Sequence, residues 1–213
     1  MKRLFISTIL FWFVTLSFAG NPAYEKAMQQ AIGQLETAES PNAYQAAANQ
    51  FLRIAQVEQS EWLPLYYASY AYIIQGAMSE SGEQKDESLD QAQEYLDQAK
   101  QLTSDESELV TLQGYIHMIR VTVDPTSRGP ELAGKATQTL ARAAQMNPDN
   151  PRAFLLLGQM QYGTAQFFGG DTSEACGLIN QAVVKYENGE TENTLMPQWG
   201  EATAQAVQQR CAQ

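Results

Sequence analysis

Histidine, cysteine and basic residues are scarce in this chain of 213 residues. It contains one histidine, His117, and two cysteines, whereas catalytic triads and most zinc sites combine histidine with several partners. His117 has no cysteine or carboxylate at ligand spacing around it, so we expect a structural role for this side chain. The pair Gly169-Gly170 lacks the Lys-Ser/Thr that completes a phosphate-binding loop, and is typical of a helix end. We therefore predict no metal ion, no cofactor and no catalytic residue.

A long apolar run occurs once, at the N-terminus. Two basic residues precede the uncharged residues 4–16, and residues 17–19 offer small side chains where a signal peptidase reads the sequence. Residues 1–19 are therefore a predicted signal peptide, cleaved after Ala19 or after Gly20. An uncleaved anchor is the alternative, although the run is shorter than the roughly 20 residues of a membrane span. Because no cysteine lies near the cleavage site to carry a lipid, we predict a periplasmic or secreted protein without a stable membrane span.

The basic residues are too few for a protein that binds nucleic acid. Without Lys2 and Arg3, 11 basic residues stand against 24 acidic ones, a net charge of −13. Nucleic acids and anionic membrane surfaces both require clustered lysine and arginine, so we expect neither as a partner. The charge leaves the oligomeric state open.

The two cysteines, Cys176 and Cys211, are compatible with export because an oxidising compartment allows them to pair. A disulfide between them would join the last helix to the rest of the fold. Two unpaired side chains that act as small hydrophobic groups are the other interpretation. Two cysteines are too few for a disulfide framework in either case.

Four pairs of an alanine and a bulky residue four positions later recur along the chain. They lie 45, 44 and 39 residues apart on helical patterns, and a recurrence of this length indicates an array of repeats. Alanine, glutamine, leucine and glutamate dominate, and runs of β-branched residues are nearly absent, so we predict an all-α fold with antiparallel neighbours. The pairs are Ala47/Phe51, Ala92/Leu96, Ala136/Leu140 and Ala175/Ile179.

The stretch that begins at Pro148 resembles a tetratricopeptide repeat (TPR). Phe154, Leu157 and Gly158 stand at the spacing of its W-x2-L-G signature, and the last of the four pairs stands for its A-x3-F element. The wider pattern is similar to exported bacterial TPR-like proteins without assigned activity. The resemblance implies a right-handed superhelical array of antiparallel helical hairpins, in which glycines such as Gly158 let one helix approach its partner.

The predicted array covers residues 20–190, and residues 191–213 form a capping helix in which Trp199 helps to cover the exposed core. The repeats are longer than the ordinary ~34 residues. We expect the extra residues mainly between the two helices of a hairpin, in loops at residues 79–86 and 123–129.

Trp62, Tyr66 and Tyr70 recur at four-residue steps and share one face of a predicted helix. Core packing is one interpretation of this stripe, because aromatic side chains mostly supply buried area. The other follows from the resemblance, because the first helices of such hairpins line a concave surface on which partners dock. Tyrosine and arginine are common in the energetic centres of interfaces. On this interpretation the partner-binding residues are Tyr66, Tyr70, Tyr115, Arg152, Gln159 and Tyr162.

We therefore predict a non-catalytic scaffold of the cell envelope that docks a protein or peptide on the concave face of a TPR-like array. Two other classes stay open. One is an enzyme that acts on glycans or cell wall through acidic residues that the array brings together. The other is a structural module whose terminal helix mediates self-association.

Overall fold

The computed structural model describes residues 21–103, 106–189 and 194–211, and every regular element in these ranges is an α-helix. The predicted signal peptide at residues 1–19 lies outside them. The nine helices of the described residues are α1 (Pro22–Glu36), α2 (Pro41–Val57), α3 (Leu63–Met78), α4 (Gly82–Leu102), α5 (Ser107–Val121), α6 (Pro125–Met146), α7 (Pro151–Phe168), α8 (Ser173–Asn188) and α9 (Glu201–Cys211).

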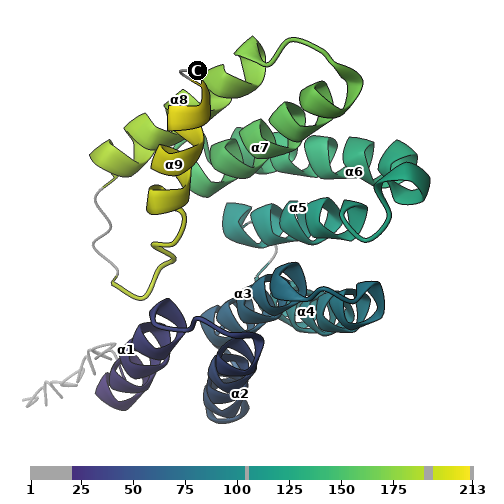
Figure 1. The fold of residues 1–213 in the computed structure, drawn as a ribbon. Coiled ribbons are helices and arrows are strands. Elements are labelled where there is room, and N and C mark those ends of the chain that lie inside the picture. The colour runs from purple at the N-terminus through teal and green to yellow at the C-terminus, as the bar shows by residue number, and fades with distance from the viewer. Residues whose placement is uncertain (1–20, 104–105, 190–193, 212–213) are drawn as a thin grey trace, which may run out of the picture.

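Successive helices form hairpins that follow one another along the molecule (Figure 1). Each helix packs on the next one in the chain, and α1, α3, α5 and α7 also contact one another in an inner row. The even-numbered helices from α2 to α8 each pack against members of this row. The prediction of an all-α fold built from sequential hairpins is confirmed.

Four helices begin with the same local device, a polar cap followed by proline at the first helical position. The side chain of the cap accepts a hydrogen bond from a free backbone N–H of the first turn, and proline has no N–H to leave unpaired there. These short signals explain why the chain can turn from one helix into the next within a few residues. The pairs are Asn21-Pro22, Ser40-Pro41, Asp124-Pro125 and Asn150-Pro151.

Small residues bring the two helices close together in the hairpins α3/α4, α5/α6 and α7/α8. A Cβ at Gly114 would meet the side chain of Leu140 at 2.5 Å, and one at Gly158 would meet Cγ1 of Ile179 at 2.7 Å. Ser69 takes the equivalent place in the hairpin of α3 and α4, and its hydroxyl donates a hydrogen bond to a carbonyl oxygen of α4 at 2.8 Å. The close approach that the sequence pattern predicts is confirmed at both glycines.

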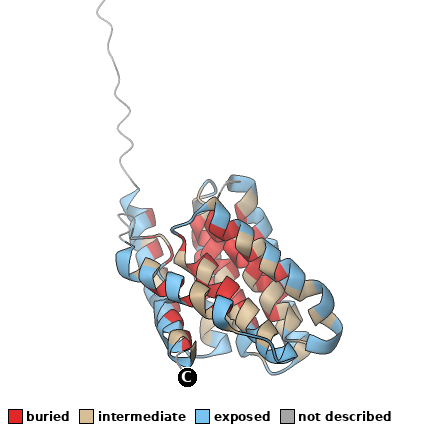
Figure 2. Ribbon diagram, turned by 90° about the horizontal axis from the view of Figure 1, so that it is seen from above, coloured by how far each residue is buried: buried red, intermediate tan, exposed pale blue. Residues whose placement is uncertain are grey.

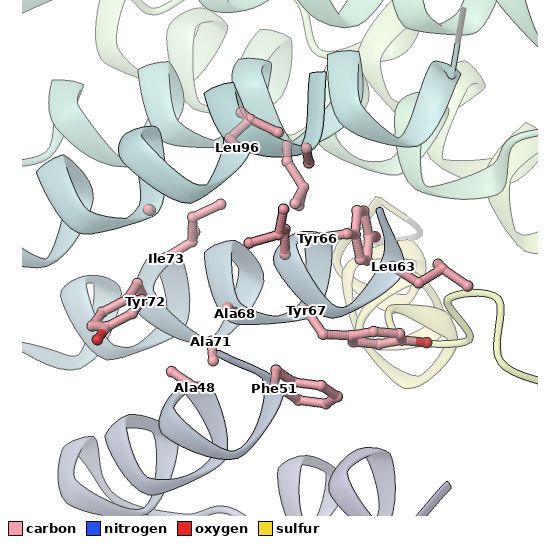
Figure 3. Close-up of a cluster of buried hydrophobic side chains, with 14 of the residues drawn as sticks. Ala48, Phe51, Leu63, Tyr66, Tyr67, Ala68, Ala71, Tyr72, Ile73 and Leu96 are labelled. Atoms are coloured by element: carbon pink, nitrogen blue, oxygen red, sulfur yellow. The ribbon is translucent and has the colours of Figure 1, made fainter. Parts of the chain in front are cut away.

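Buried residues lie on the helix faces that turn toward neighbouring helices (Figure 2). The largest cluster joins α1 to α5 and includes Leu195 from the segment that precedes α9. Within it, Phe51 of α2 stacks on Tyr67 of α3 with ring centroids 5.0 Å apart (Figure 3). The core is therefore a seam between consecutive hairpins, and the C-terminal segment contributes to its N-terminal part.

Two connections are shorter than the sequence pattern indicates. The expected loop at residues 79–86 is wrong, because Ser81 caps α4 and the helix begins at Gly82. The expected loop at residues 123–129 is wrong too, because Asp124 caps α6 directly. The additional length of these repeats lies instead in the second helices, with 21 residues in α4 and 22 in α6.

A disulfide joins Cys176 of α8 to Cys211 of α9 across a separation of 35 residues. Such bonds persist in oxidising compartments, so the pairing is consistent with a location outside the cytoplasm. Within the described part of the chain, no helix combines the length and the apolar character that crossing a bilayer requires.

Replacing Gly158 by alanine should destabilise the protein by about 1–3 kcal/mol, because the added Cβ overlaps Ile179 and lies 3.0 Å from a backbone carbonyl oxygen. Gly163 lies in the same helix, and a Cβ there would have no neighbour within 4 Å, so Gly163→Ala should stabilise by up to about 1 kcal/mol. The measurement is the free energy of unfolding in urea, followed by circular dichroism. Equal stabilities of the two variants would contradict the close approach of α7 and α8.

Candidate functional site

Residues 194–200 form a strap without regular secondary structure that crosses the inner row of helices before α9 begins. Tyr67 of α3 donates a hydrogen bond to the Leu195 carbonyl oxygen at 2.9 Å, and Figure 3 shows its hydroxyl pointing toward the strap. At the other end, Tyr186 of α8 donates to the Trp199 carbonyl oxygen at 2.9 Å. The strap therefore connects the last hairpin with the early part of the array, as its course in Figure 1 shows.

Trp199 is the main contact between the strap and the inner row. Its indole ring stacks on Tyr70 of α3, with centroids 4.6 Å apart, and on Tyr115 of α5, with centroids 6.0 Å apart. The guanidinium of Arg152, from α7, lies 5.8 Å from the centre of the same ring, within cation–π range. Gly200 follows with a φ of 108°, and a Cβ there would overlap a tyrosine hydroxyl of α8, so this turn requires glycine.

A network of buried polar groups continues from Trp199 into the core. The indole Nε1 donates to the Tyr66 hydroxyl at 2.8 Å, and that hydroxyl donates to Oε2 of Glu108 at 2.9 Å. Nε of Arg152 donates to both carboxylate oxygens of Glu108, at 2.9 and 3.0 Å, and its Nη2 lies 2.8 Å from Oε1. Glu108 and Arg152 are only 3% and 7% exposed, so each charge depends on the other for compensation.

Asn150 explains how Arg152 reaches this network. Its side-chain oxygen accepts a hydrogen bond from the backbone N–H of Arg152 at 3.0 Å and so caps α7. Its Nδ2 donates to the hydroxyl oxygens of Ser107 at 3.0 Å and Thr111 at 3.3 Å, both on α5. The first turns of α5 and α7 are therefore tied together, and this places Arg152 opposite the carboxylate at the start of α5.

Burial and charge shift the pKa values of these groups. Burial raises the pKa of Tyr66 well above its usual value, and the negative charge of Glu108 raises it further. Burial alone would lower the pKa of Arg152, but the charge and hydrogen bonds of Glu108 hold it above its usual value. Burial also raises the pKa of Tyr115 to about 12. The tyrosines and the arginine keep their protons near neutral pH, so they are poor candidates for acid–base catalysis.

A cleft of about 320 Å³ opens beside the strap. One wall comes from α1, α2 and α3, and the other comes from the strap. Three tyrosines and a tryptophan face it together with aliphatic side chains, and Glu36 is the charged member of its described lining. The lining residues are Ile32, Leu35, Glu36, Tyr44, Tyr67, Tyr70, Thr194, Met196, Gln198 and Trp199.

Two other hollows, of about 340 and 380 Å³, lie along α3 between α2 and α4. Glutamines make up much of their lining, and the volumes do not separate them from the cleft. The aromatic content of the lining does separate them, because aromatic side chains are typical of small-molecule sites. Four aromatic residues line the cleft beside the strap, against one in each of the other hollows.

Four of the six predicted partner-binding residues gather at the strap, and Trp199 occupies the face between them. Tyr66 is fully buried, so the core-packing interpretation applies to this residue. The other two predicted residues, Gln159 and Tyr162, lie farther along α7, where Tyr162 accepts a hydrogen bond from a glutamine of its own helix. The four that gather are Tyr66, Tyr70, Tyr115 and Arg152.

The strap itself is the part of the site that sequence reasoning missed. The expectation that Trp199 covers the end of the array is wrong, because its ring stacks on Tyr70 and Tyr115 in the middle of the inner row. The available signal was a group of apolar residues, Leu195-Met196-Pro197, close to a tryptophan in an otherwise polar stretch. Such residues require burial somewhere, but their spacing does not say where.

His117 lies apart from the cleft, half-buried on α5, where Gln113 approaches its Nε2 at 3.4 Å. Burial lowers the pKa of His117, and the nearby positive charges of Lys135 and Arg120 lower it further, so the ring is neutral at pH 7. Across the described ranges, no three His, Cys, Asp or Glu side chains are grouped as metal ligands.

Replacing Arg152 by methionine should destabilise the protein by about 3–5 kcal/mol, because it leaves the Glu108 carboxylate buried without a partner. The double variant Glu108→Leu/Arg152→Met keeps the volume, removes both charges and should recover most of the loss. Unfolding in urea measures both free energies. If the double variant were as unstable as the single one, the two charges would not be the cause.

No protein-family model matches the sequence, and no curated protein matches it either. Among solved structures, the HusA haemophore from Porphyromonas gingivalis is similar to this chain, with 30% sequence identity and a TM-score of 0.80. The match covers 88% of this chain and 92% of that chain, so it includes most of the array of hairpins. A haemophore is a binding protein and not an enzyme, in agreement with the predicted absence of catalysis. The identity and the coverage together show that this chain belongs to the family of the HusA haemophore.

Proposed function

We propose that this protein is an exported, non-catalytic binding protein for haem or a related tetrapyrrole, which it holds in the cleft beside the strap. The aromatic lining of that cleft carries the proposal, in a chain that is 30% identical to a haemophore. Tyr44, Tyr67 and Tyr70 present rings to the cleft from two helices, and Trp199 lines it from the strap. Flat aromatic surfaces stack on such rings in offset or edge-on arrangements, and a porphyrin is a large flat aromatic surface.

The residues of the cleft fit recognition of the macrocycle better than recognition of its iron. Haem iron in proteins is held by histidine, cysteine, methionine or tyrosine. His117 is outside the lining, and the two cysteines are joined in a disulfide. Burial raises the pKa values of Tyr44, Tyr67 and Tyr70, which disfavours the ionised phenolate that iron prefers. Met196 is the remaining ligand candidate, so stacking and burial should supply most of the affinity.

The charges near the cleft favour an outward orientation for the carboxylates of haem. Glu36 lines the cleft and repels other carboxylates. Arg152 lies over Trp199, but its guanidinium is already engaged by Glu108. We therefore infer that the apolar edge of the macrocycle enters the cleft and that its carboxylates stay in solvent.

We also propose that the hairpins wind as a right-handed, TPR-like array and that the protein works in the periplasm or outside the cell. The predicted signal peptide at residues 1–19 and the disulfide between Cys176 and Cys211 support this location. The strap covers part of the inner face on which a protein or peptide partner is predicted to dock. A small flat ligand beside the strap therefore suits the geometry better than a peptide along the array.

Titration of residues 20–213 with hemin and with metal-free protoporphyrin IX tests this function, followed by absorbance and by tryptophan fluorescence. We expect saturable binding of both, with affinities within about threefold, because stacking does not need the metal. Tyr44→Ala should weaken binding about tenfold, because it removes a ring from the cleft. Tyr95→Ala is the matched control. Like Tyr44, Tyr95 is half-buried on the second helix of a hairpin, but it lines another hollow. Failure of both tetrapyrroles to bind, or equal losses in the two variants, would refute the proposed site.

Glu36→Gln should tighten hemin binding by up to about fivefold at low ionic strength, because it removes an exposed negative charge beside the ligand carboxylates. Added salt should reduce the gain because it screens that charge. The dimethyl ester of protoporphyrin IX lacks these carboxylates and serves as the control ligand. A similar gain for the ester would contradict the charge argument.

A further inference from the structure

The cleft beside the strap is small for a tetrapyrrole. Its volume of about 320 Å³ lies at the lower end of the roughly 300–1,000 Å³ of ordinary small-molecule sites. Four of its ten lining residues belong to the strap, namely Thr194, Met196, Gln198 and Trp199. A macrocycle of four linked pyrrole rings therefore requires the strap wall to give way, because the opposite wall is made of packed helices.

Trp199 occupies a seat that suits any flat ring. We define the seat as the ring faces of Tyr70 and Tyr115 together with the guanidinium of Arg152. Stacking and cation–π contacts of this kind depend on the shape and electron distribution of a ring rather than on its identity. The hydrogen bond from Nε1 to the Tyr66 hydroxyl is the contact specific to indole.

Helix α9 is attached to α8 independently of the strap. The disulfide between Cys176 and Cys211 ties α9 to α8, and buried side chains of α9 add to that attachment. Gly200 lies between the strap and α9 with a φ of 108°. Glycine adopts other backbone conformations at little cost, so this position is a suitable hinge.

We propose that residues 194–200 move off the inner face when a tetrapyrrole binds, and that the seat of Trp199 then receives part of the ligand ring. This inference rests on the proposed function. In the closed form the strap competes with the ligand for the seat, so the apparent Kd is the intrinsic Kd divided by the open fraction. Contacts that hold the strap closed therefore weaken binding, although they lie beside the site.

Two variants test the competition. Tyr186→Phe removes the hydrogen bond to the Trp199 carbonyl oxygen and the contact of the same hydroxyl with Arg152, but it leaves the lining of the cleft unchanged. It should tighten hemin binding about fivefold. Trp199→Ala empties the seat and should tighten binding further. Tyr72→Phe is the control, because its hydroxyl accepts a hydrogen bond from Gln45 away from the cleft, and it should leave the Kd unchanged.

The competing explanation is that the strap is a fixed wall that contacts the ligand. Unchanged or weaker hemin binding in either Tyr186→Phe or Trp199→Ala would support that explanation and overturn the displacement. The same titrations with protoporphyrin IX exclude an effect that depends on iron.

Hydrogen exchange on the wild-type protein gives an independent measurement that does not depend on the folding of a variant. Amides in residues 194–200 should exchange about tenfold faster in the protein loaded with protoporphyrin IX than in the free protein, while amides of α9 keep their rates. Slower exchange in the strap would show that it closes over the ligand, which overturns the displacement but retains the proposed function. Absence of tetrapyrrole binding by the wild type and by every variant would reject the proposed function, and the displacement with it.

Discussion

The buried ion pair between Glu108 and Arg152 sets the arrangement of the candidate site. Neither charge is exposed to water, so each is stable only while the other is in place. The pair joins α5 to α7, and the Tyr66 hydroxyl extends the network to α3 and from there to the indole of Trp199. Apolar contacts alone would tolerate small slips between helices, whereas hydrogen bonds of this network are met in one register. The aromatic seat exists because three inner helices are held at that register.

Much of the fold could be predicted because the helices and their pairing depend on residues close together in the sequence. Small residues at helical spacing had to face bulky ones, and Gly114 indeed lies against Leu140. The starts of α4 and α6 could not be recognised as easily, because their first turns are polar and lack the apolar periodicity that marks a helix. In α4, the cap at Ser81 and the buried residues farther along, such as Leu89 and Leu96, stabilise the helix. They allow its first turns to form from charged and polar residues.

The candidate site also has one part that could be predicted from the sequence and one part that could not. Tyr66, Tyr70, Tyr115 and Arg152 could be identified together because they recur on the first helices of successive hairpins. The buried ion pair has a related signal, since its two residues are separated by 44 positions, which is the spacing of the middle repeats. The strap has no such signal, because Trp199 meets Tyr66 across 133 positions and follows no period. Which surface a terminal segment covers depends on the shape of the assembled array, and that shape is absent from any local pattern.

Besides joining α8 to α9, the disulfide limits how much of the C-terminal segment can move with the strap. A segment that leaves its seat gains conformational freedom, and the cost of its return grows with the length of chain released. In the proposed displacement, the bond between Cys176 and Cys211 keeps α9 beside α8, so the released segment ends at Gly200 and the cost of closing it stays small. The proposed function requires release of the ligand as well as binding. A wall that opens and closes at low cost allows both steps while the hairpins, and the ion pair that aligns them, remain folded.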